Sequence, residues 1–464
     1  MKTPIAKNFS KPARILVVVF LFIASMPIWF STALDLALRK FPHNPALQEL
    51  GWRLEHPLAQ KATFYRLQPG SRQWLHLGRK LGEDDGDVAL MLYQFFSSSQ
   101  PRQANLWLKK AITLGNPQAY EIQVRRLIDS NQLDKAHRLI ESIANAPESY
   151  WSLKLQIALE LEQGSDVLEA INHLSETAPT HLMLAEVEKF SITDYWQQQK
   201  LRAGALAATR SCPTSVQFYA SSLNQLNRIS RLQELLNNEP FFAREFCFYS
   251  PRYVPKSVLG CSDDSDLRLE CDVDSLADTY LRSTADYVGI IAENGRANVN
   301  NGILYLDVQD DIQVFKHELM HLVGFIDEYS LPGEHQVCQV DKFAAIAKNI
   351  VVSAGKNQQF ESEQQAREQL FDTIPWSALI KDSTPVTQVV DGVRVLGTPS
   401  DYQGEVGLFA AQTCDNHYSQ GYKPTYRWGL MRYNSLALSE VYQRIHRLNR
   451  NRFAMQKFIE HAAR

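Results

Sequence analysis

The stretch KHELMHLVGFIDEY, Lys316–Tyr329, places two histidines four residues apart around a glutamate. The run GILYLDV just before it is typical of a β-strand, and Asp310 or Asp311 can cap a helix that starts there. Apolar residues from 312 to 323 recur on one helix face, and Gly324 can end the helix because it lacks a Cβ. This pattern predicts a buried helix directly after a strand, in a mixed α/β domain.

The same stretch carries the residue types of a catalytic metal site. His317 and His321 lie one helical turn apart, so both side chains can face a single ion. Glu318 is placed to take a proton from a water molecule without binding the metal itself. The chain that folds back after the glycine brings Asp327 and Glu328 within range of the same ion. Three protein ligands would leave one position for water, which is typical of catalytic zinc sites.

The run HELMHLVGFID resembles the extended zinc motif of the metzincin clan, in which the third ligand follows the second histidine by six residues. That ligand is usually histidine, and here the position holds Asp327, as in the snapalysin-type variant. The longer run ending in Asp-Glu-Tyr is similar to the immunoglobulin-A-protease type of bacterial metallopeptidase. Some members space the aspartate one residue further on, so Glu328 stays open as an alternative. The resemblance implies a zinc ion held by His317, His321 and Asp327, with Glu318 as general base.

Metzincins also have a methionine turn beneath the metal, and RWGLMRYNS offers Met431 for that place. Tyr433 follows at the spacing of the astacin-like Met-x-Tyr, so the resemblance implies a catalytic tyrosine that steadies the oxyanion. Ordinary core packing of Met431 is the alternative. We expect Tyr329 and His335 to be structural, and His417 to be a surface histidine that could serve as a fallback ligand.

The chain before this domain has a different organisation. Residues 45–235 are predicted to form successive helices, in which alanines at spacings of 32 and 34 are each followed four residues later by a larger apolar residue: Ala104 and Leu108, Ala136 and Ile140, Ala170 and Leu174. This arrangement resembles degenerate tetratricopeptide or Sel1-like repeats, with an irregular helical domain as the alternative. From 240 to 464 aromatic residues, cysteines and strand-like runs predict the zinc metallopeptidase domain.

The N-terminus predicts a membrane segment. An uncharged run over 15–34 follows a basic tail over 1–14, which is typical of a transmembrane signal anchor, with a cleaved signal peptide as the alternative. The expected localisation is a single-pass membrane protein with a cytoplasmic N-terminus and a periplasmic or extracellular bulk, or a secreted protein after cleavage. All six cysteines lie after residue 211, and Cys261 with Cys271 is the most local disulfide candidate, with free buried thiols as the alternative.

Together these features predict a multidomain protein: a transmembrane helix, an all-α helical-repeat domain and a C-terminal α/β metzincin-like zinc peptidase domain. The expected function is a membrane-tethered zinc-dependent metalloendopeptidase that acts on a protein or peptide, with the repeats free to bind a partner protein. One alternative is a non-catalytic repeat scaffold with a vestigial or structural zinc domain, and another is a zinc hydrolase acting on a non-peptide bond. The net charge of −3, without a basic block beyond the N-terminal tail, argues against nucleic-acid binding.

Overall fold

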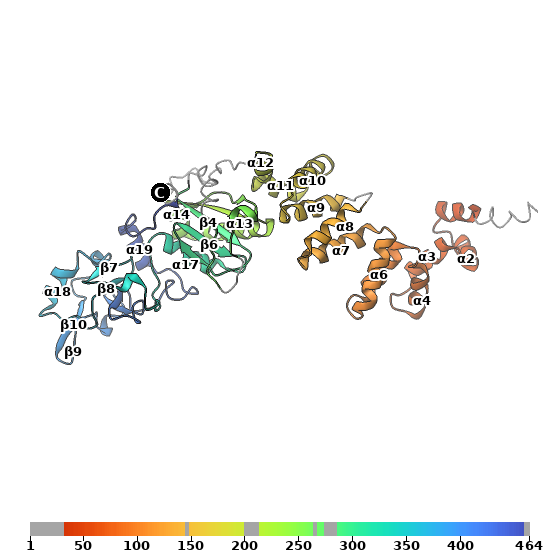
Figure 1. Ribbon diagram of the computed structural model, residues 1–464. Helices are drawn as coiled ribbons and strands as arrows, with labels where there is room; N and C mark the ends of the chain where they lie inside the picture. Colours follow the sequence, from red (N-terminus) through yellow and green to blue (C-terminus); the bar gives the residue numbers. More distant parts are fainter. Residues whose placement is uncertain (1–31, 144–147, 199–212, 263–266, 273–284, 459–464) are drawn as a thin grey trace, which may run out of the picture. The chain divides into compact units, whose positions relative to one another are not determined.

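The computed structural model describes residues 32–143, 148–198, 213–262, 267–272 and 285–458 (Figure 1). The chain divides into two compact units, residues 1–153 and residues 154–464.

The described part of the first unit is helical. Its helices often begin at a proline that follows a capping residue, because proline suits the first helical position, where no N–H is needed. The side chain of Asn116, for example, accepts a hydrogen bond from Ala119 N as α7 begins. The helices are α2 (Pro45–Arg53), α3 (Pro57–Arg66), α4 (Arg72–Leu81), α5 (Gly86–Phe96), α6 (Pro101–Thr113), α7 (Pro117–Asp129) and α8 (Leu133–Glu141).

The small and large residues that recur in the sequence mark buried helix faces. Ala104 and Leu108 are buried in α6, and Ala136 and Ile140 are buried in α8. Neighbouring helices pack in pairs, α5 with α6 and α7 with α8. The alternation therefore reflects close helix packing, and the assignment to a repeat family stays a prediction.

The second unit continues with helices and then forms a sheet. The helices are α9 (Glu148–Glu160), which spans the boundary between the units, α10 (Gly164–Thr177), α11 (Leu182–Lys189) and α12 (Ile192–Gln198). The sheet has the order β2-β1-β4-β6-β5, with β3 also paired to β1. All of its pairings are parallel except that of the edge strand β5 with β6. The strands are β1 (Thr214–Ala220), β2 (Phe246–Phe248), β3 (Arg252–Tyr253), β4 (Tyr287–Ala292), β5 (Asn298–Asn300) and β6 (Ile303–Asp307).

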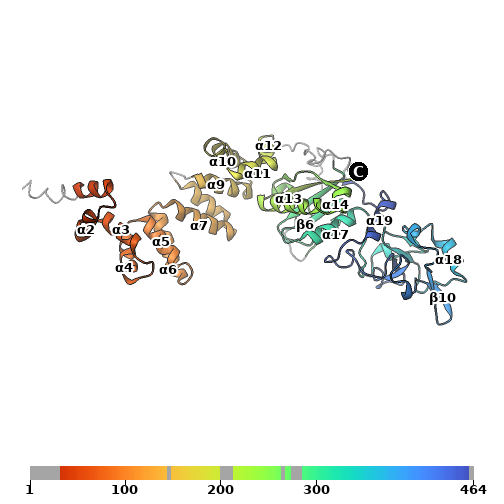
Figure 2. The same cartoon turned by 180° about the vertical axis from the view of Figure 1, so that it is seen from behind.

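Two helices position the site against this sheet. Helices α13 (Leu223–Asn237) and α17 (Ile312–Leu322) contact each other and the sheet, as Figures 1 and 2 show. Phe315 of α17 packs against Phe218 of β1 and Phe248 of β2, with ring centroids 5.5 and 5.6 Å away. Aromatic packing of this kind buries much apolar area and fixes α17 on the sheet. The short helices α14 (Pro240–Glu245) and α15 (Lys256–Leu259) complete this part.

The sheet begins earlier in the chain than the sequence predicted. Strand β1 and most of helix α13 lie inside the range 45–235, which was predicted to be helical repeats, but β1 is a central strand between β2 and β4. Because β1 contains polar residues, its sequence does not have the apolar pattern of a buried strand. Ser215 bonds Asp286 through its hydroxyl at 2.9 Å, and the amide of Gln217 donates to Ser250 O at 2.9 Å. These partners let polar side chains lie in a fully buried strand, which the sequence pattern alone does not show.

The C-terminal part of the unit contains a second sheet, with the order β11-β12-β8-β7, and a separate β9–β10 hairpin. Its strands are β7 (Ala344–Ala345), β8 (Val351–Ser353), β9 (Thr387–Val390), β10 (Val393–Leu396), β11 (Phe409–Ala411) and β12 (Gln420–Lys423). The α-helices are α18 (Glu363–Leu370) and α19 (Glu440–Leu448), and the 3-10 helices are η1 (Gln336–Cys338), η2 (Ser377–Leu379) and η3 (Ser400–Tyr402).

Disulfides reinforce the second unit. The predicted pair Cys261–Cys271 is formed, and a second disulfide joins Cys338 to Cys414. Cys247 in β2 is disulfide-bonded as well. Disulfides of this number are typical of an oxidising compartment.

The predicted transmembrane helix, and with it the predicted single-pass membrane localisation, requires correction. No helix among the described residues is both long and apolar enough to cross a membrane. The longest described helix, α13, has 15 residues, whereas a span needs about 20. Of the predicted segment 15–34, all but the last three residues lie outside the described part, as does the basic tail 1–14. The fold that the structure shows is a helical region followed by a region built on β-sheets.

Candidate metal centre

The helix that carries the two histidines begins and ends where the sequence predicted. Asp311 caps α17, because its carboxylate accepts hydrogen bonds from the backbone N–H groups of Gln313 and Val314. Gly324 follows the helix with a positive φ of 93°, and a Cβ there would collide with the backbone of Phe453. The glycine thus allows the sharp turn that sends the next residues back along the helix.

This turn brings three ligand atoms together. His317 Nε2 lies 3.0 Å from His321 Nε2 and 3.0 Å from Asp327 Oδ1, and His321 Nε2 lies 3.4 Å from the same oxygen. All three side chains are largely buried. Ligands about 2.0–2.2 Å from a tetrahedral zinc ion lie roughly 3.3–3.5 Å apart. The observed triangle is within a few tenths of an ångström of that geometry.

Hydrogen bonding shows which ring nitrogens face the centre of the triangle. His317 Nδ1 lies 3.0 Å from Leu430 O, and His321 Nδ1 lies 3.0 Å from Phe325 O. A carbonyl oxygen only accepts, so each Nδ1 carries a hydrogen, and in the neutral form of each imidazole Nε2 presents a lone pair. Histidine ligands are commonly oriented in this way by a second hydrogen bond.

The third ligand position also fits a cation. Asp327 Oδ1 is buried and faces the two Nε2 atoms at 3.0 and 3.4 Å. Two nitrogen lone pairs and a carboxylate oxygen directed at one point repel one another unless a positive charge, either a metal ion or a proton on one imidazole, lies between them. Two imidazoles and one carboxylate are a donor set that zinc takes in catalytic sites.

The alternative ligand Glu328 points elsewhere. Its side chain is fully buried and accepts hydrogen bonds from Tyr442 of α19 and from Asn349. Burial raises the pKa of this carboxyl group, which Lys423, Tyr442 and Asn349 partly offset. Asp327 therefore takes the position near the histidines, and its neighbour anchors the segment to the protein interior.

The segment around Met431 lies directly against the metal ligands. The carbonyl of Leu430 receives the hydrogen bond from His317, and the carbonyl of Met431 accepts one from Glu328 N at 2.9 Å. Met431 is fully buried, and Arg432 N and Tyr433 N both donate to Gly429 O, which closes a turn. Met431 is therefore buried in a turn beside His317, and its identity as a methionine turn of the metzincin type stays a prediction.

Two residues that the sequence did not single out hold the segment with Asp327 in place. Asn349 is fully buried; its Oδ1 accepts from Ile326 N at 3.0 Å and its Nδ2 donates to Ile326 O at 2.9 Å. The Thr413 hydroxyl donates to Asp327 O at 2.8 Å, beside the disulfide of Cys414. Neither residue lies in a recognisable motif, so no sequence signal identified them.

The structure also places three further candidate residues, the glutamate next to the first histidine and two tyrosines. Glu318, next to the first ligand, is buried, and burial raises the pKa of its carboxyl group, which His321 and His317 partly offset. Tyr329, expected to be structural, lies beside the site: burial and the charge of Asp327 raise the pKa of its phenol. Tyr433 is 46% exposed, and its hydroxyl forms no hydrogen bond with a described residue.

The two other histidines that the sequence singled out, His335 and His417, do not belong to the group formed by His317, His321 and Asp327. The backbone N–H of His335 donates to Pro332 O, and His417 Nε2 lies 3.1 Å from the same carbonyl oxygen. The group of potential ligands around His317 includes neither of them. His417 is therefore placed as a surface histidine that contacts a loop.

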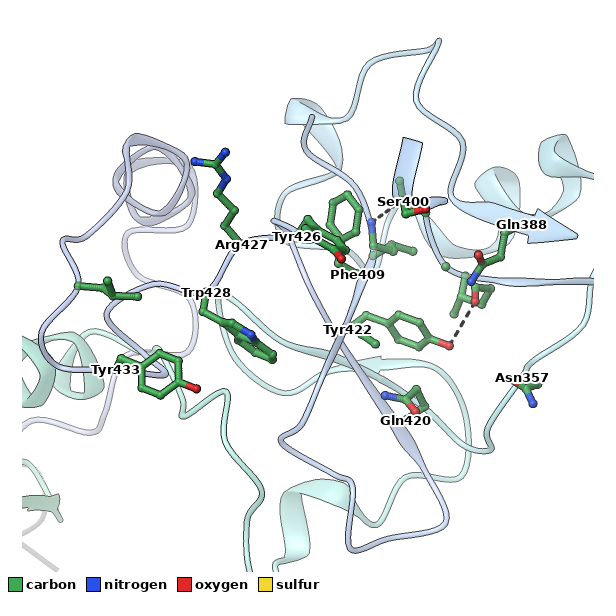
Figure 3. Close-up of a pocket in the computed structure, with 16 residues that line it drawn as sticks. Asn357, Gln388, Ser400, Phe409, Gln420, Tyr422, Tyr426, Arg427, Trp428 and Tyr433 are labelled. Atoms are coloured by element: carbon green, nitrogen blue, oxygen red, sulfur yellow. Dashed lines mark hydrogen bonds between the residues drawn. The ribbon is translucent and has the colours of Figure 1, made fainter. Parts of the chain in front are cut away.

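A pocket of about 800 Å³ adjoins the methionine turn (Figure 3). Trp428 and Tyr433 lie at one end, and Gln388 and Asn357 lie at the other. The lining includes five aromatic side chains and three side-chain amides, but no aspartate or glutamate: Asn357, Gln388, Leu396, Gly397, Thr398, Ser400, Leu408, Phe409, Ala410, Gln420, Tyr422, Tyr426, Arg427, Trp428, Tyr433 and Leu436. A pocket of this size and character suits a segment of a larger ligand.

Metal binding at this site should depend on pH. Burial alone would lower the pKa of His321, but Asp327 raises it to about 9 in the metal-free chain. A metal must displace that proton, so below pH 9 the apparent zinc affinity should fall about tenfold per pH unit from this group alone. Burial would raise the pKa of Asp327, but His317 and His321 hold it well below its usual range, so its charge persists. We expect zinc to bind about a hundredfold more weakly at pH 6 than at pH 8, measured by competition with a chelator. A flat profile would contradict this protonation state.

Replacing Asn349 with alanine should weaken the metal site as well as the fold. The lost hydrogen bonds leave Ile326 N and O unpaired in the interior, which costs about 1–3 kcal/mol of unfolding free energy. Because Asn349 holds the segment with Asp327, we expect zinc affinity to fall about 10- to 100-fold. Thermal melting of the metal-free protein and chelator competition measure the two effects separately. The exposed Asn451→Ala serves as the matched control, and unchanged zinc affinity in Asn349→Ala would show that its role is structural only.

The site is thus a candidate metal centre, in which two histidines and one aspartate could hold an ion beside an adjacent glutamate, on a helix that packs on a mostly parallel sheet. No protein-family model matches the chain, and no curated protein matches its sequence. The resemblance to metzincin-like peptidases therefore rests on the motif and on this geometry.

Proposed function

We propose that this protein is a zinc-dependent peptidase whose metal is held by His317, His321 and Asp327. The observation that carries the proposal is the triangle of Nε2, Nε2 and Oδ1 atoms, 3.0–3.4 Å apart, beside a buried glutamate. A structural site gains nothing from an adjacent carboxylate that does not bind the metal, whereas a hydrolytic site needs a proton acceptor there.

Each residue of the site has a role in peptide hydrolysis. Bound zinc would lower the pKa of a water molecule and polarise the substrate carbonyl. Glu318 accepts the proton of the attacking water and passes it to the leaving amine; a pKa raised by burial suits both transfers. Tyr433, on the turn beside the metal, and Tyr329, beside Asp327, are the phenols placed to donate to the developing oxyanion.

The proposal is tested by digestion of an unfolded protein. Full-length protein loaded with one equivalent of zinc is incubated with reduced and carboxymethylated albumin, and new peptide N-termini are identified by mass spectrometry. We expect cleavage that a chelator abolishes and added zinc restores. Zinc binding without any cleavage would contradict the proposal and favour a scaffold with a non-catalytic metal centre.

A further inference from the structure

An arginine that has no acidic partner among the described residues lies next to the proposed active site. Arg432 directly follows Met431, and its Nε donates to Gln412 Oε1 at 3.0 Å. Its guanidinium lies 4.5 Å from the ring centroid of Tyr433, 5.9 Å from that of Trp428 and 6.0 Å from that of Tyr329. Three aromatic rings and one amide therefore fix its position.

The two terminal nitrogens of this guanidinium, Nη1 and Nη2, have no hydrogen-bond partner among the described residues. Among the residues that the structure describes, no carboxylate forms an ion pair with Arg432, and its Nη atoms form no hydrogen bond. Two other arginines of the same unit form ion pairs, Arg367 with Glu363 at 2.9 Å and Arg450 with Glu245 at 2.8 Å. A guanidinium held rigidly by stacking, with its fork of N–H groups free, is suited to bidentate binding of a carboxylate.

Its surroundings favour an anionic ligand. Trp428 and Tyr433, which pack on Arg432, also line the pocket of about 800 Å³, and the pocket lining contains Arg427 but no acidic residue. Tyr329, the third ring, is the neighbour of Asp327 on the metal side. Arg432 therefore contacts both a ring next to the proposed metal ligand Asp327 and two rings that line the pocket.

A nearby lysine does not compete for this role. Lys423 is 1% exposed and lies 4.3 Å from the Trp428 ring centroid. Its ammonium group already donates to the carbonyls of Thr425, Tyr426 and Arg427. Its hydrogen bonds are therefore used to hold the loop that carries Trp428.

We propose that Arg432 is a specificity-determining residue that binds a carboxylate of the substrate near the scissile bond. The inference rests on the proposed peptidase function and names the substrate class: peptides with an acidic group at a fixed distance from the cleaved bond. The carboxylate can come from an Asp or Glu side chain or from a free peptide C-terminus. Either source presents the same two oxygens to the guanidinium.

The experiment compares cleavage sites in reduced and carbamidomethylated albumin, whose blocked cysteines carry no carboxylate, digested by the parent, Arg432→Gln, Arg432→Lys and the exposed control Arg447→Gln. A peptide containing the best site is then made in matched pairs, with Glu replaced by Gln, or with the C-terminal carboxylate replaced by a carboxamide. Hydrogen bonds to a charged group change affinity by roughly tenfold to a hundredfold. We expect kcat/KM of the parent to fall by that factor when the recognised carboxylate is neutralised, and the pair that responds identifies the source.

The cleavage preferences of the three variants test whether Arg432 binds the carboxylate of the substrate. Arg432→Gln should cleave the acidic and neutral peptides equally, Arg432→Lys should keep part of the preference, and Arg447→Gln should behave like the parent. Zinc content and thermal melting confirm that each variant is folded and loaded. Cleavage by the parent without any acidic preference, or a preference that survives in Arg432→Gln, would overturn this inference alone. Absence of all cleavage by the zinc-loaded parent would overturn the proposed function and this inference together.

Discussion

Replacing Glu318 with glutamine is expected to lower kcat/KM for peptide hydrolysis about a hundredfold to ten-thousandfold, the usual contribution of a general base. Glutamine has nearly the same shape but cannot accept the proton of the attacking water. Since Glu318 is not one of the three ligand residues, zinc binding should remain near one equivalent per chain. The loss should appear in kcat, because the proton transfer takes place in the transition state.

The measurement is a comparison of initial rates on one peptide, with zinc content determined on the same samples. Glu334→Gln, which changes an exposed carboxylate of the same unit, is the matched control and should retain parental rates. Full activity in Glu318→Gln would exclude this residue as the general base. Loss of zinc together with activity would instead assign it a role in holding the metal.

Replacing Asp327 with asparagine is expected to abolish stable zinc binding. The amide is neutral, so it neither offsets the charge of the ion nor matches the carboxylate as a ligand. Removing a direct ligand should weaken zinc affinity by more than the roughly hundredfold limit known for residues that only support ligands. Dialysis against a weak chelator should leave the variant nearly free of zinc while the parent keeps about one ion per chain.

Glu328→Gln is the matched comparison for this prediction. The glutamate lies next to Asp327 in sequence, yet its carboxylate is bound to Tyr442 and Asn349 in the interior. Glutamine can still accept the hydrogen bond from the tyrosine, so the variant should fold and retain zinc. The reverse result, with zinc lost in Glu328→Gln and kept in Asp327→Asn, would show that Glu328 is the third ligand.

The helix of the metal site could be predicted because its signals are local. Asp311 caps α17, apolar residues mark its buried face, and Gly324 provides the positive φ at its end, all within fifteen residues. The histidine spacing then places both imidazoles on one side. The predicted disulfide Cys261–Cys271 had the same advantage of a short separation along the chain.

The remaining parts of the site depend on contacts between distant segments. Asn349 follows Asp327 by more than twenty residues, and Leu430 follows His317 by more than a hundred, so only the folded chain brings their hydrogen bonds to the ligands. The central strand β1 was missed because its polar side chains find partners, such as Asp286, that the sequence does not reveal. For Arg432, the sequence shows a cation between the candidate residues Met431 and Tyr433, but only the folded chain shows that no described carboxylate pairs with it.

X-ray absorption at the zinc edge of the reconstituted full-length protein tests the central claim most directly. The structure predicts about four nitrogen and oxygen ligands at about 2.0–2.2 Å, with the scattering pattern of two imidazoles and no sulfur at about 2.3 Å. In Asp327→Asn this signal should be lost with the metal. Sulfur ligands, a third imidazole, or no stable zinc in the parent would contradict a catalytic centre formed by His317, His321 and Asp327.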